Sequence, residues 1–192
     1  PLALVFEEAG FPVRGFDVLG LTLQTELAYT SALALLDLSG IPLLSRDRTP
    51  ADPVVIGGGP CAFNPEPVAD FFDALAVGDG EDVVHEIADA VLAWKGSGED
   101  RSGLHRRLSR VPGVYVPSLF TPRFDPATGA LLAMDALDPG HERVVRRVVP
   151  DIDTLSTSAY EHPVVPFMQT VHDRLPIELQ RGCTRGCRFC QA

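Results

Sequence analysis

Basic residues and long apolar runs are both scarce in this 192-residue chain. It carries 16 lysines and arginines against 26 aspartates and glutamates, and the net charge of -10 argues against a broad nucleic-acid surface. No stretch approaches the roughly 18 apolar residues that span a membrane, and no basic, apolar leader opens the chain. With 45% hydrophobic and 22% charged residues, the composition is typical of a soluble globular protein without a membrane or nucleic-acid partner.

Cysteine is rare as well, yet three of the four cysteines stand together near the end of the chain. Cys183, Cys187 and Cys190 have the spacing C-x3-C-x2-C, with Phe189 just before the last one. Three thiolates this close together can hold three irons of a 4Fe–4S cluster and leave the fourth iron without a protein ligand. Clustered thiols and an oxygen-sensitive cluster both suit a reducing compartment, so we expect a cytoplasmic protein.

Zinc and redox-active thiols are the alternative interpretations of these cysteines. Structural zinc takes four ligands, commonly as two separated pairs, but the fourth cysteine, Cys61, lies far upstream and no histidine follows the motif. A disulfide would leave one of the three clustered thiols unpaired. A zinc- or redox-thiol binding module without catalysis therefore stays open as the second hypothesis.

The spacing of the three cysteines resembles the signature of the radical S-adenosylmethionine (radical SAM) enzymes. The resemblance implies that the open iron binds S-adenosylmethionine and that one electron cleaves it to a 5′-deoxyadenosyl radical. It also implies that Phe189 lies near the adenine of that cofactor. Small-molecule cofactors and an electron donor such as flavodoxin or ferredoxin are the partners implied. The sequence singles out no catalytic residue and no substrate.

Strand-like and helical patterns alternate over the first 98 residues, which predicts an open parallel α/β sheet with flanking helices. Loops that follow the strands of such a sheet lie at one edge, where ligands bind. The expected strands are 16–23, 54–56 and 74–77, and the expected helices are 29–38 and 81–95. The apolar stripe of the second helix would consist of Val84, Ile87, Ala88, Val91 and Leu92.

The character of the sequence changes after residue 98. Turn pairs such as Asp125-Pro126 and Thr128-Gly129 favour a β-hairpin within 117–142. Residues 176–181 alternate between apolar and polar and run directly into the cysteines, where a first barrel strand would stand. A short helix at 104–108 and strand-like runs at 114–116 and 144–149 complete the expected elements.

Two glycine-rich turns follow the second and third expected strands. The first holds Gly57, Gly58 and Gly59, and the second holds Gly78 and Gly80. Glycines at strand ends let a ligand approach the backbone closely, although three glycines also form ordinary tight turns. The acidic residues crowded at the second turn argue against a phosphate site.

Taken with the cysteines, these turns resemble the radical SAM proteins that carry an N-terminal cobalamin-binding-type domain. The sequence segments 16–20 and 57–67 resemble those of an uncharacterised bacterial branch of that group. The resemblance implies cobalamin as a further cofactor, with methyl transfer to a carbon as one outcome. The residues implied to contact it are Gly57, Gly58, Gly59, Gly78, Gly80 and Glu81.

The sequence departs from that pattern in one respect, because the motif Asp-x-His-x-x-Gly is absent from these 192 residues. Its histidine ligates cobalt in many cobalamin proteins. An α/β domain that only packs against the barrel, without a cofactor, is the alternative.

Three segments are expected in the chain. Residues 1–98 form a cobalamin-binding-like, Rossmann-type α/β domain that is incomplete at its N-terminus. Residues 99–173 form a β-rich linker with a short helix and a hairpin, and 174–192 begin a truncated radical SAM (β/α) barrel. Because most of that barrel follows the cysteine motif in the family, we expect this chain to be a fragment of a larger protein and inactive alone.

Overall fold

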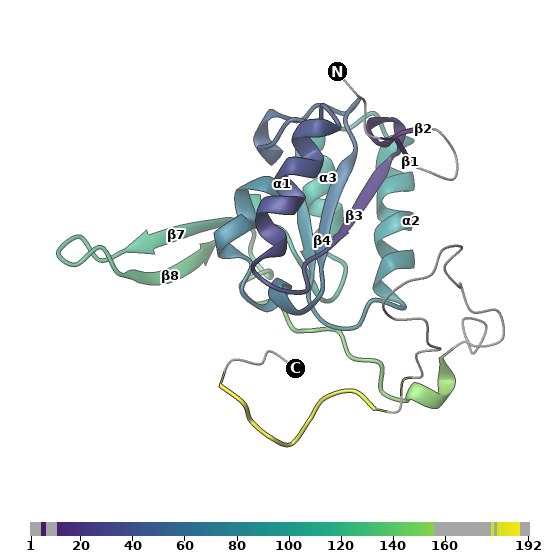
Figure 1. The fold of residues 1–192 in the computed structure, drawn as a ribbon. Coiled ribbons are helices and arrows are strands. Elements are labelled where there is room, and N and C mark those ends of the chain that lie inside the picture. The colour runs from purple at the N-terminus through teal and green to yellow at the C-terminus, as the bar shows by residue number, and fades with distance from the viewer. Residues whose placement is uncertain (1–4, 7–10, 156–177, 179, 189–192) are drawn as a thin grey trace. The chain divides into compact units, whose positions relative to one another are not determined.

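The computed structural model describes residues 5–6, 11–155, 178 and 180–188 (Figure 1). Contacts divide the chain into two compact units, Pro1–Val148 and Val149–Ala192, which are described separately. None of the helices in the described residues combines the length and the apolar character needed to cross a membrane.

The first unit is built on a four-stranded sheet in the order β3-β4-β5-β6. These strands are β3 (Val18–Thr22), β4 (Val54–Gly58), β5 (Ala74–Ala76) and β6 (Val114–Tyr115). The predicted parallel sheet is confirmed for the first three strands, but β6 runs antiparallel to β5. The connection from β5 to β6 contains two helices, whereas a parallel crossover usually contains one. The chain therefore enters β6 at the same end of the sheet at which it left β5, and the two strands run antiparallel.

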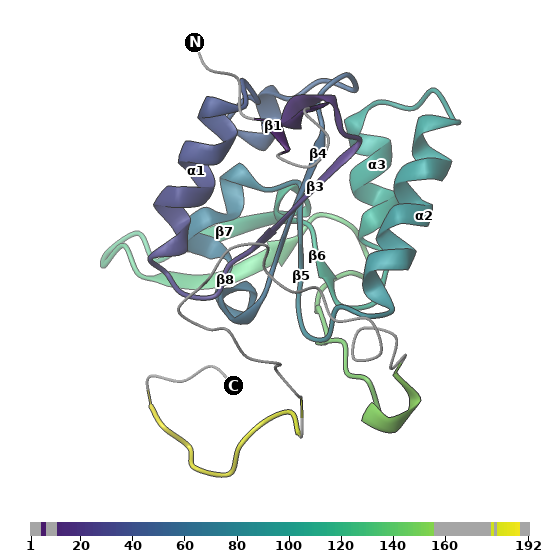
Figure 2. The same ribbon diagram turned by 45° about the vertical axis from the view of Figure 1, so that its right-hand side comes forward.

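Helices cover both faces of this sheet, as Figure 2 shows. One face is covered by α1 (Ala28–Leu38), and the other by α2 (Val83–Lys95) and α3 (Arg101–Leu108). Side chains alternate between the faces along each strand. In β4, Val55 joins the cluster under α1, whereas Val54 and Ile56 join the cluster under α2 and α3. The predicted α/β architecture with flanking helices is therefore confirmed.

The buried stripe of α2 differs from the predicted one. Val83, Ile87, Val91 and Trp94 are buried, whereas Val84 and Leu92 are 57% and 68% exposed. The predicted and the observed stripe both fit helical spacing. The burial of Trp94 determines which of the two faces the sheet. Its indole N–H donates to the backbone oxygens of the loop after the helix, which fixes the rotation of α2 on the sheet.

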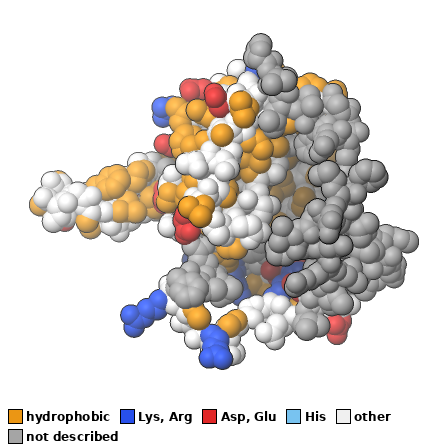
Figure 3. Space-filling model, in the orientation of Figure 1, with side chains coloured by type: hydrophobic (Ala, Val, Ile, Leu, Met, Phe, Trp, Pro, Cys, Tyr) orange, Lys and Arg blue, Asp and Glu red, His pale blue; other side chains and the backbone are white. Residues whose placement is uncertain are grey.

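A hairpin follows the sheet, inside the segment where turn-rich sequence favours one. It consists of β7 (Phe120–Phe124) and β8 (Leu131–Ala136), which pair antiparallel. Figure 3 shows apolar side chains along it, and Phe124, Leu131 and Leu132 are each at least half exposed. The strand-like run 144–149 forms no strand, and Arg147 makes a single parallel bridge to Gly78.

Short elements complete the first unit. A two-residue pair, β1 (Val5–Phe6) and β2 (Phe11–Pro12), precedes the sheet. Residues Glu66–Phe71 form a 3₁₀ helix, η4. The other 3₁₀ helices are η1 (Val13–Gly15), η2 (Ser45–Asp47), η3 (Pro60–Phe63) and η5 (Pro117–Leu119).

The second unit contains η6 (Ile152–Thr154) and the described part of the cysteine loop, 180–188. Half of the predicted first barrel strand at 176–181 lies outside the described residues, as do Phe189 and Cys190.

Candidate functional site

The cysteine loop of the second unit exposes both of its described thiols. Cys183 and Cys187 are reduced and exposed to solvent. Two glycines in the left-handed region, Gly182 (φ 80°) and Gly186 (φ 63°), turn the backbone just before each cysteine. The backbone N–H of Arg185 donates to Cys183 Sγ over 3.3 Å. A backbone N–H directed at a sulfur is typical of the hydrogen bonds that surround metal-binding cysteines.

Arginines flank these thiols in the sequence. Arg185 and Arg188 make no ion pair within the described part of the chain, whereas Arg181 is held 2.7 Å from Glu178. Arginines near the thiols can balance the negative charge of a bound cluster. No group of three potential metal ligands is assembled among the described residues, and the third predicted ligand, Cys190, lies outside them. The loop thus presents two ligands and a suitable electrostatic environment.

A separate cavity of about 590 Å³ lies in the first unit at the carboxyl ends of β3, β4 and β5, beneath the first half of α2. Both predicted glycine turns line it, whereas Glu81 does not belong to its walls. The walls consist of Val18, Gly20, Leu21, Thr22, Ile56, Gly57, Gly58, Gly59, Ala76, Gly78, Gly80, Val83, Val84, Ile87 and Ala88.

The cavity exists because side chains on the α2 face of the sheet shrink toward the carboxyl ends of the strands. Near the amino end of β4, Val54 and Ile56 fill the space against Val91 and Trp94. Beyond them, β4, β5 and the turns that follow these strands contribute only glycine and alanine to the walls, and these side chains are too short to reach the helix. A gap therefore opens between the sheet and α2, at the edge where ligands of parallel sheets bind.

The glycines of this cavity differ in what they do. A Cβ at Gly20 or Gly80 would meet nothing within 4 Å, so their hydrogens face open space. Gly59 has φ 93°, and a Cβ there would lie 3.0 Å from the backbone oxygen of Leu23. Gly78 has φ 108°, and its Cβ would overlap the backbone of Arg147. Gly20 and Gly80 therefore leave room for a ligand. Gly59 and Gly78 are required by the backbone conformation of the turns in which they lie.

The chemistry of the cavity is apolar. No charged side chain and no histidine belongs to its walls, and Thr22 carries the one side-chain hydroxyl among the wall residues. A volume of this size suits a flat apolar group bounded by backbone N–H and C=O groups. It does not suit a phosphate, which agrees with the acidic residues of the second turn.

Sequence reasoning foresaw some of these features and missed others. Gly20 was not singled out, because a glycine inside a strand carries no turn signal. Cys61, the fourth cysteine, is 1% exposed and packs in the core, as free cysteines often do. A further polar network around Asp73 and His105 was not foreseen at all, and its residues come from segments distant in sequence.

Similarity to known proteins extends over most of the chain. The family model described as "Radical SAM proteins, N-terminal" matches residues 2–117. The uncharacterized protein MJ0966 of Methanocaldococcus jannaschii is 27% identical over 184 residues, which are 94% of this chain and 31% of that protein. The chain thus spans about a third of the length of this curated relative. No solved structure matches the chain.

Proposed function

Since this chain belongs to the family of N-terminal regions of radical SAM proteins, we propose that it is part of an enzyme that cleaves S-adenosylmethionine reductively at a 4Fe–4S cluster. Two separate stretches support this proposal. The family match ends at residue 117, so it does not depend on the cysteines at 183–190. The spacing of those cysteines points independently to the same chemistry.

The residues proposed to hold the cluster are Cys183, Cys187 and Cys190. When bound, the cluster would supply the electron that converts S-adenosylmethionine to the 5′-deoxyadenosyl radical, which abstracts hydrogen from a substrate. Three protein ligands leave one iron for the amino and carboxylate groups of S-adenosylmethionine. The exposed thiols of Cys183 and Cys187 and the N–H that Arg185 directs at Cys183 fit a bound anionic cluster. So do Arg185 and Arg188, which make no ion pair with any residue that the structure describes. Phe189 is proposed to lie against the adenine.

The glycine-lined cavity is proposed to accept part of a cobalamin. Its apolar walls fit the flat base of the nucleotide tail of cobalamin. The cavity is too small to hold the corrin ring in addition to that base. Contacts would come from the backbone of Gly57, Gly58 and Gly59 and of the turn at 78–80. Because no histidine belongs to the walls, cobalt would carry no imidazole from this cavity. Methyl transfer to a carbon is the reaction this pairing of cofactors supports.

The proposed enzyme needs an electron donor such as flavodoxin or ferredoxin and a reducing compartment, for which we propose the cytoplasm. Its substrate would be selected by parts of the protein beyond this chain, which covers about a third of the relative's length.

Anaerobic reconstitution of the full-length protein with iron and sulfide tests the cluster assignment. We expect about four irons and four acid-labile sulfides per protein and turnover of S-adenosylmethionine under reductant. Cys187→Ala should lose both the cluster and the turnover. Cys61→Ala is the matched control, because it removes a thiol buried in the first unit and should keep both. One zinc without sulfide would support the zinc- or redox-thiol alternative. Unchanged turnover in Cys187→Ala would refute the assignment of the cluster to these cysteines.

A further inference from the structure

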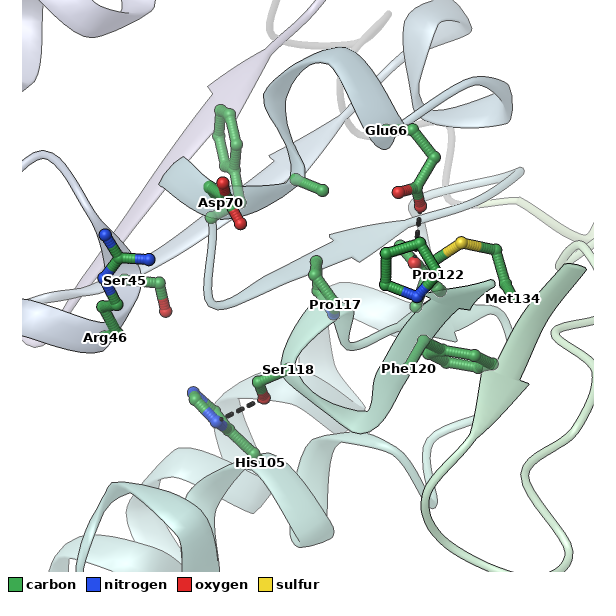
Figure 4. A pocket seen from close by; sticks show the side chains of 13 residues that line it. Ser45, Arg46, Glu66, Asp70, His105, Pro117, Ser118, Phe120, Pro122 and Met134 are labelled. Atoms are coloured by element: carbon green, nitrogen blue, oxygen red, sulfur yellow. Dashed lines mark hydrogen bonds between the residues drawn. The ribbon is translucent and has the colours of Figure 1, made fainter. Parts of the chain in front are cut away.

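A second pocket, of about 390 Å³, lies in the first unit and shares no residue with the glycine-lined cavity. It is formed between η2, η4, the end of α3, and the segment that leads from β6 into the hairpin. Figure 4 shows Ser45 and Arg46 at one end of it and Phe120, Pro122 and Met134 at the other. The second end also carries the carboxylate of Glu66, which accepts a hydrogen bond from Tyr115, so it combines apolar side chains with one polar pair.

A chain of three side chains reaches this pocket from the core. Ser118 is exposed, and its Oγ lies 2.8 Å from His105 Nδ1 (Figure 4). The other ring nitrogen, Nε2, lies 3.4 Å from Asp73 Oδ1. Solvent exposure decreases from Ser118 to Asp73: the side chain of His105 is 11% exposed, and that of Asp73 is fully buried. The order is hydroxyl, imidazole and carboxylate, with the hydroxyl at the pocket.

The surroundings of Asp73 fix the direction of these hydrogen bonds. Burial opposes its ionisation, but hydrogen bonds from His105 and Arg101 and the charges of Arg101 and Arg48 outweigh burial. The pKa of this carboxyl is thereby held well below its usual range. An ionised carboxylate only accepts hydrogen bonds, so Nε2 of the imidazole carries the proton. In the neutral imidazole Nδ1 then holds a free electron pair, to which the hydroxyl of Ser118 donates.

The carboxylate is also held in place, which keeps the imidazole oriented. Arg48 and Arg101 contact its oxygens over 2.9 to 3.2 Å, and the backbone N–H of Val55 donates to Oδ2 over 2.8 Å. Asp73 therefore cannot turn away when the ring changes its protonation state. A nucleophile bonded to a base, with the base oriented by a third group, is the arrangement that activates a hydroxyl.

We propose that Ser118 is an activated nucleophile and that this pocket carries an acyl-transfer activity toward small carboxylic esters, separate from the radical chemistry. Arg46 lines the same pocket and makes no ion pair in the described part of the chain, so its cation is available to a developing oxyanion. The side chains of Phe120 and Met134, at the other end, would receive the hydrocarbon part of the acyl group. Asp73 acts through His105 and is a positioning residue.

The reaction balances with water as the one co-reactant. Oγ of Ser118 forms a bond to the carbonyl carbon as the ester C–O bond breaks, and its proton passes to Nδ1 of His105. That proton then goes to the leaving alkoxide, which departs as an alcohol. Water attacks the acyl-serine, the imidazole takes a proton from it and returns that proton to Oγ, and a carboxylic acid is released.

Labelling of the full-length protein with a fluorophosphonate, before any iron is added, tests this proposal independently of the cluster. We expect an adduct on Ser118, located by peptide mass spectrometry, and hydrolysis of p-nitrophenyl butyrate. Ser118→Ala should abolish both, and His105→Gln should slow both by about a hundredfold or more, because its amide still donates and accepts but takes no proton. Ser39→Ala is the control, since its hydroxyl donates to Leu35 on α1.

Two results would overturn the proposal. The first is the absence of an adduct on Ser118 while other serines react. The second is labelling of His105→Gln at the wild-type rate, which would make Ser118 merely exposed and the network purely structural. Should His105→Gln fail to fold, ester hydrolysis in Ser118→Ala still decides, because Ser118 lies at the surface and its loss leaves the core intact.

Discussion

The guanidinium of Arg101, at the start of α3, contacts both carboxylate oxygens of Asp73, just ahead of β5, over 3.2 and 3.1 Å. The same guanidinium donates to the backbone oxygens of Thr49, Asp52 and Pro53, ahead of β4. One buried side chain therefore joins α3 to the segments that enter two adjacent strands. The carboxylate of Asp73 is fully buried and also forms an ion pair with Arg48.

Arg101→Met should destabilise the protein strongly. Removing one partner of a buried, hydrogen-bonded ion pair leaves charge and backbone oxygens without partners, which typically costs about 3–5 kcal/mol. Urea unfolding followed by circular dichroism measures the difference. Arg123→Met is the matched control, because its ion pair with Asp135 lies on the exposed hairpin and should contribute little. Similar losses in the two variants would contradict a special role for the buried network.

Acidification should lower the free energy of unfolding, because it protonates the carboxyl of Asp73. The pKa of Asp73 is depressed in the folded state by its hydrogen bonds and its two arginines, in spite of burial. Such a group contributes stability that is present above its unfolded-state pKa, about 3.9, and is lost as the pH falls through the lower folded-state value. The free energy of unfolding should therefore decrease progressively below about pH 5.

Arg101→Met is also the control for this pH dependence. Without that guanidinium the pKa of Asp73 should lie closer to its ordinary value, so the loss of stability on acidification should be smaller. Parallel stability curves for the two proteins between pH 6 and pH 2 would assign the acid sensitivity to other carboxyls.

The parts of the fold that could be predicted are those whose signals are local. The strand around Val18–Thr22, the helix ending before Gly40 and the glycine turns are all visible in short stretches of sequence. The direction of β6 was not predictable in this way, because it depends on two helices packing as a pair. The rotation of α2 depends on two hydrogen bonds of Trp94 that helical periodicity does not contain.

The polar network illustrates the same limit for the candidate sites. Asp73 meets Arg48 and Arg101 across 25 and 28 positions of sequence, and His105 meets it across 32. None of these residues has a distinctive spacing. The glycine-lined cavity was half predictable, since the turns were evident but the contribution of Gly20 required knowledge of which strands are adjacent. The three cysteines, in contrast, carry their signal entirely in their spacing.

Gly20→Val should weaken cobalamin binding if the glycine-lined cavity accepts part of that cofactor. A Cβ at this position meets nothing within 4 Å, so the larger side chain can enter the cavity without displacing protein atoms. Valine also suits a strand, so folding should be preserved. We expect binding to weaken by about tenfold or more, which corresponds to about 1.4 kcal/mol.

Retention of hydroxocobalamin on gel filtration, followed by its visible absorbance, measures this effect. Thr121→Val is the matched control, because it places the same side chain on the exposed strand β7. Equal retention by both variants would place any bound cobalamin outside this cavity, and no retention by the wild-type protein would support a domain without the cofactor.

Arg185→Pro should lower the reduction potential of a cluster held by the cysteine loop. The substitution removes the backbone N–H that lies 3.3 Å from Cys183 Sγ. A hydrogen bond to a cluster sulfur stabilises the reduced, more negative state, so its loss makes the cluster harder to reduce. Arg185→Ala separates this effect from that of charge, because it keeps the N–H and removes only the guanidinium. Potentiometric titration of the reconstituted full-length protein, read by electron paramagnetic resonance, gives both values. If the alanine variant shifts as far as the proline variant, the charge of Arg185 and not its backbone sets the potential.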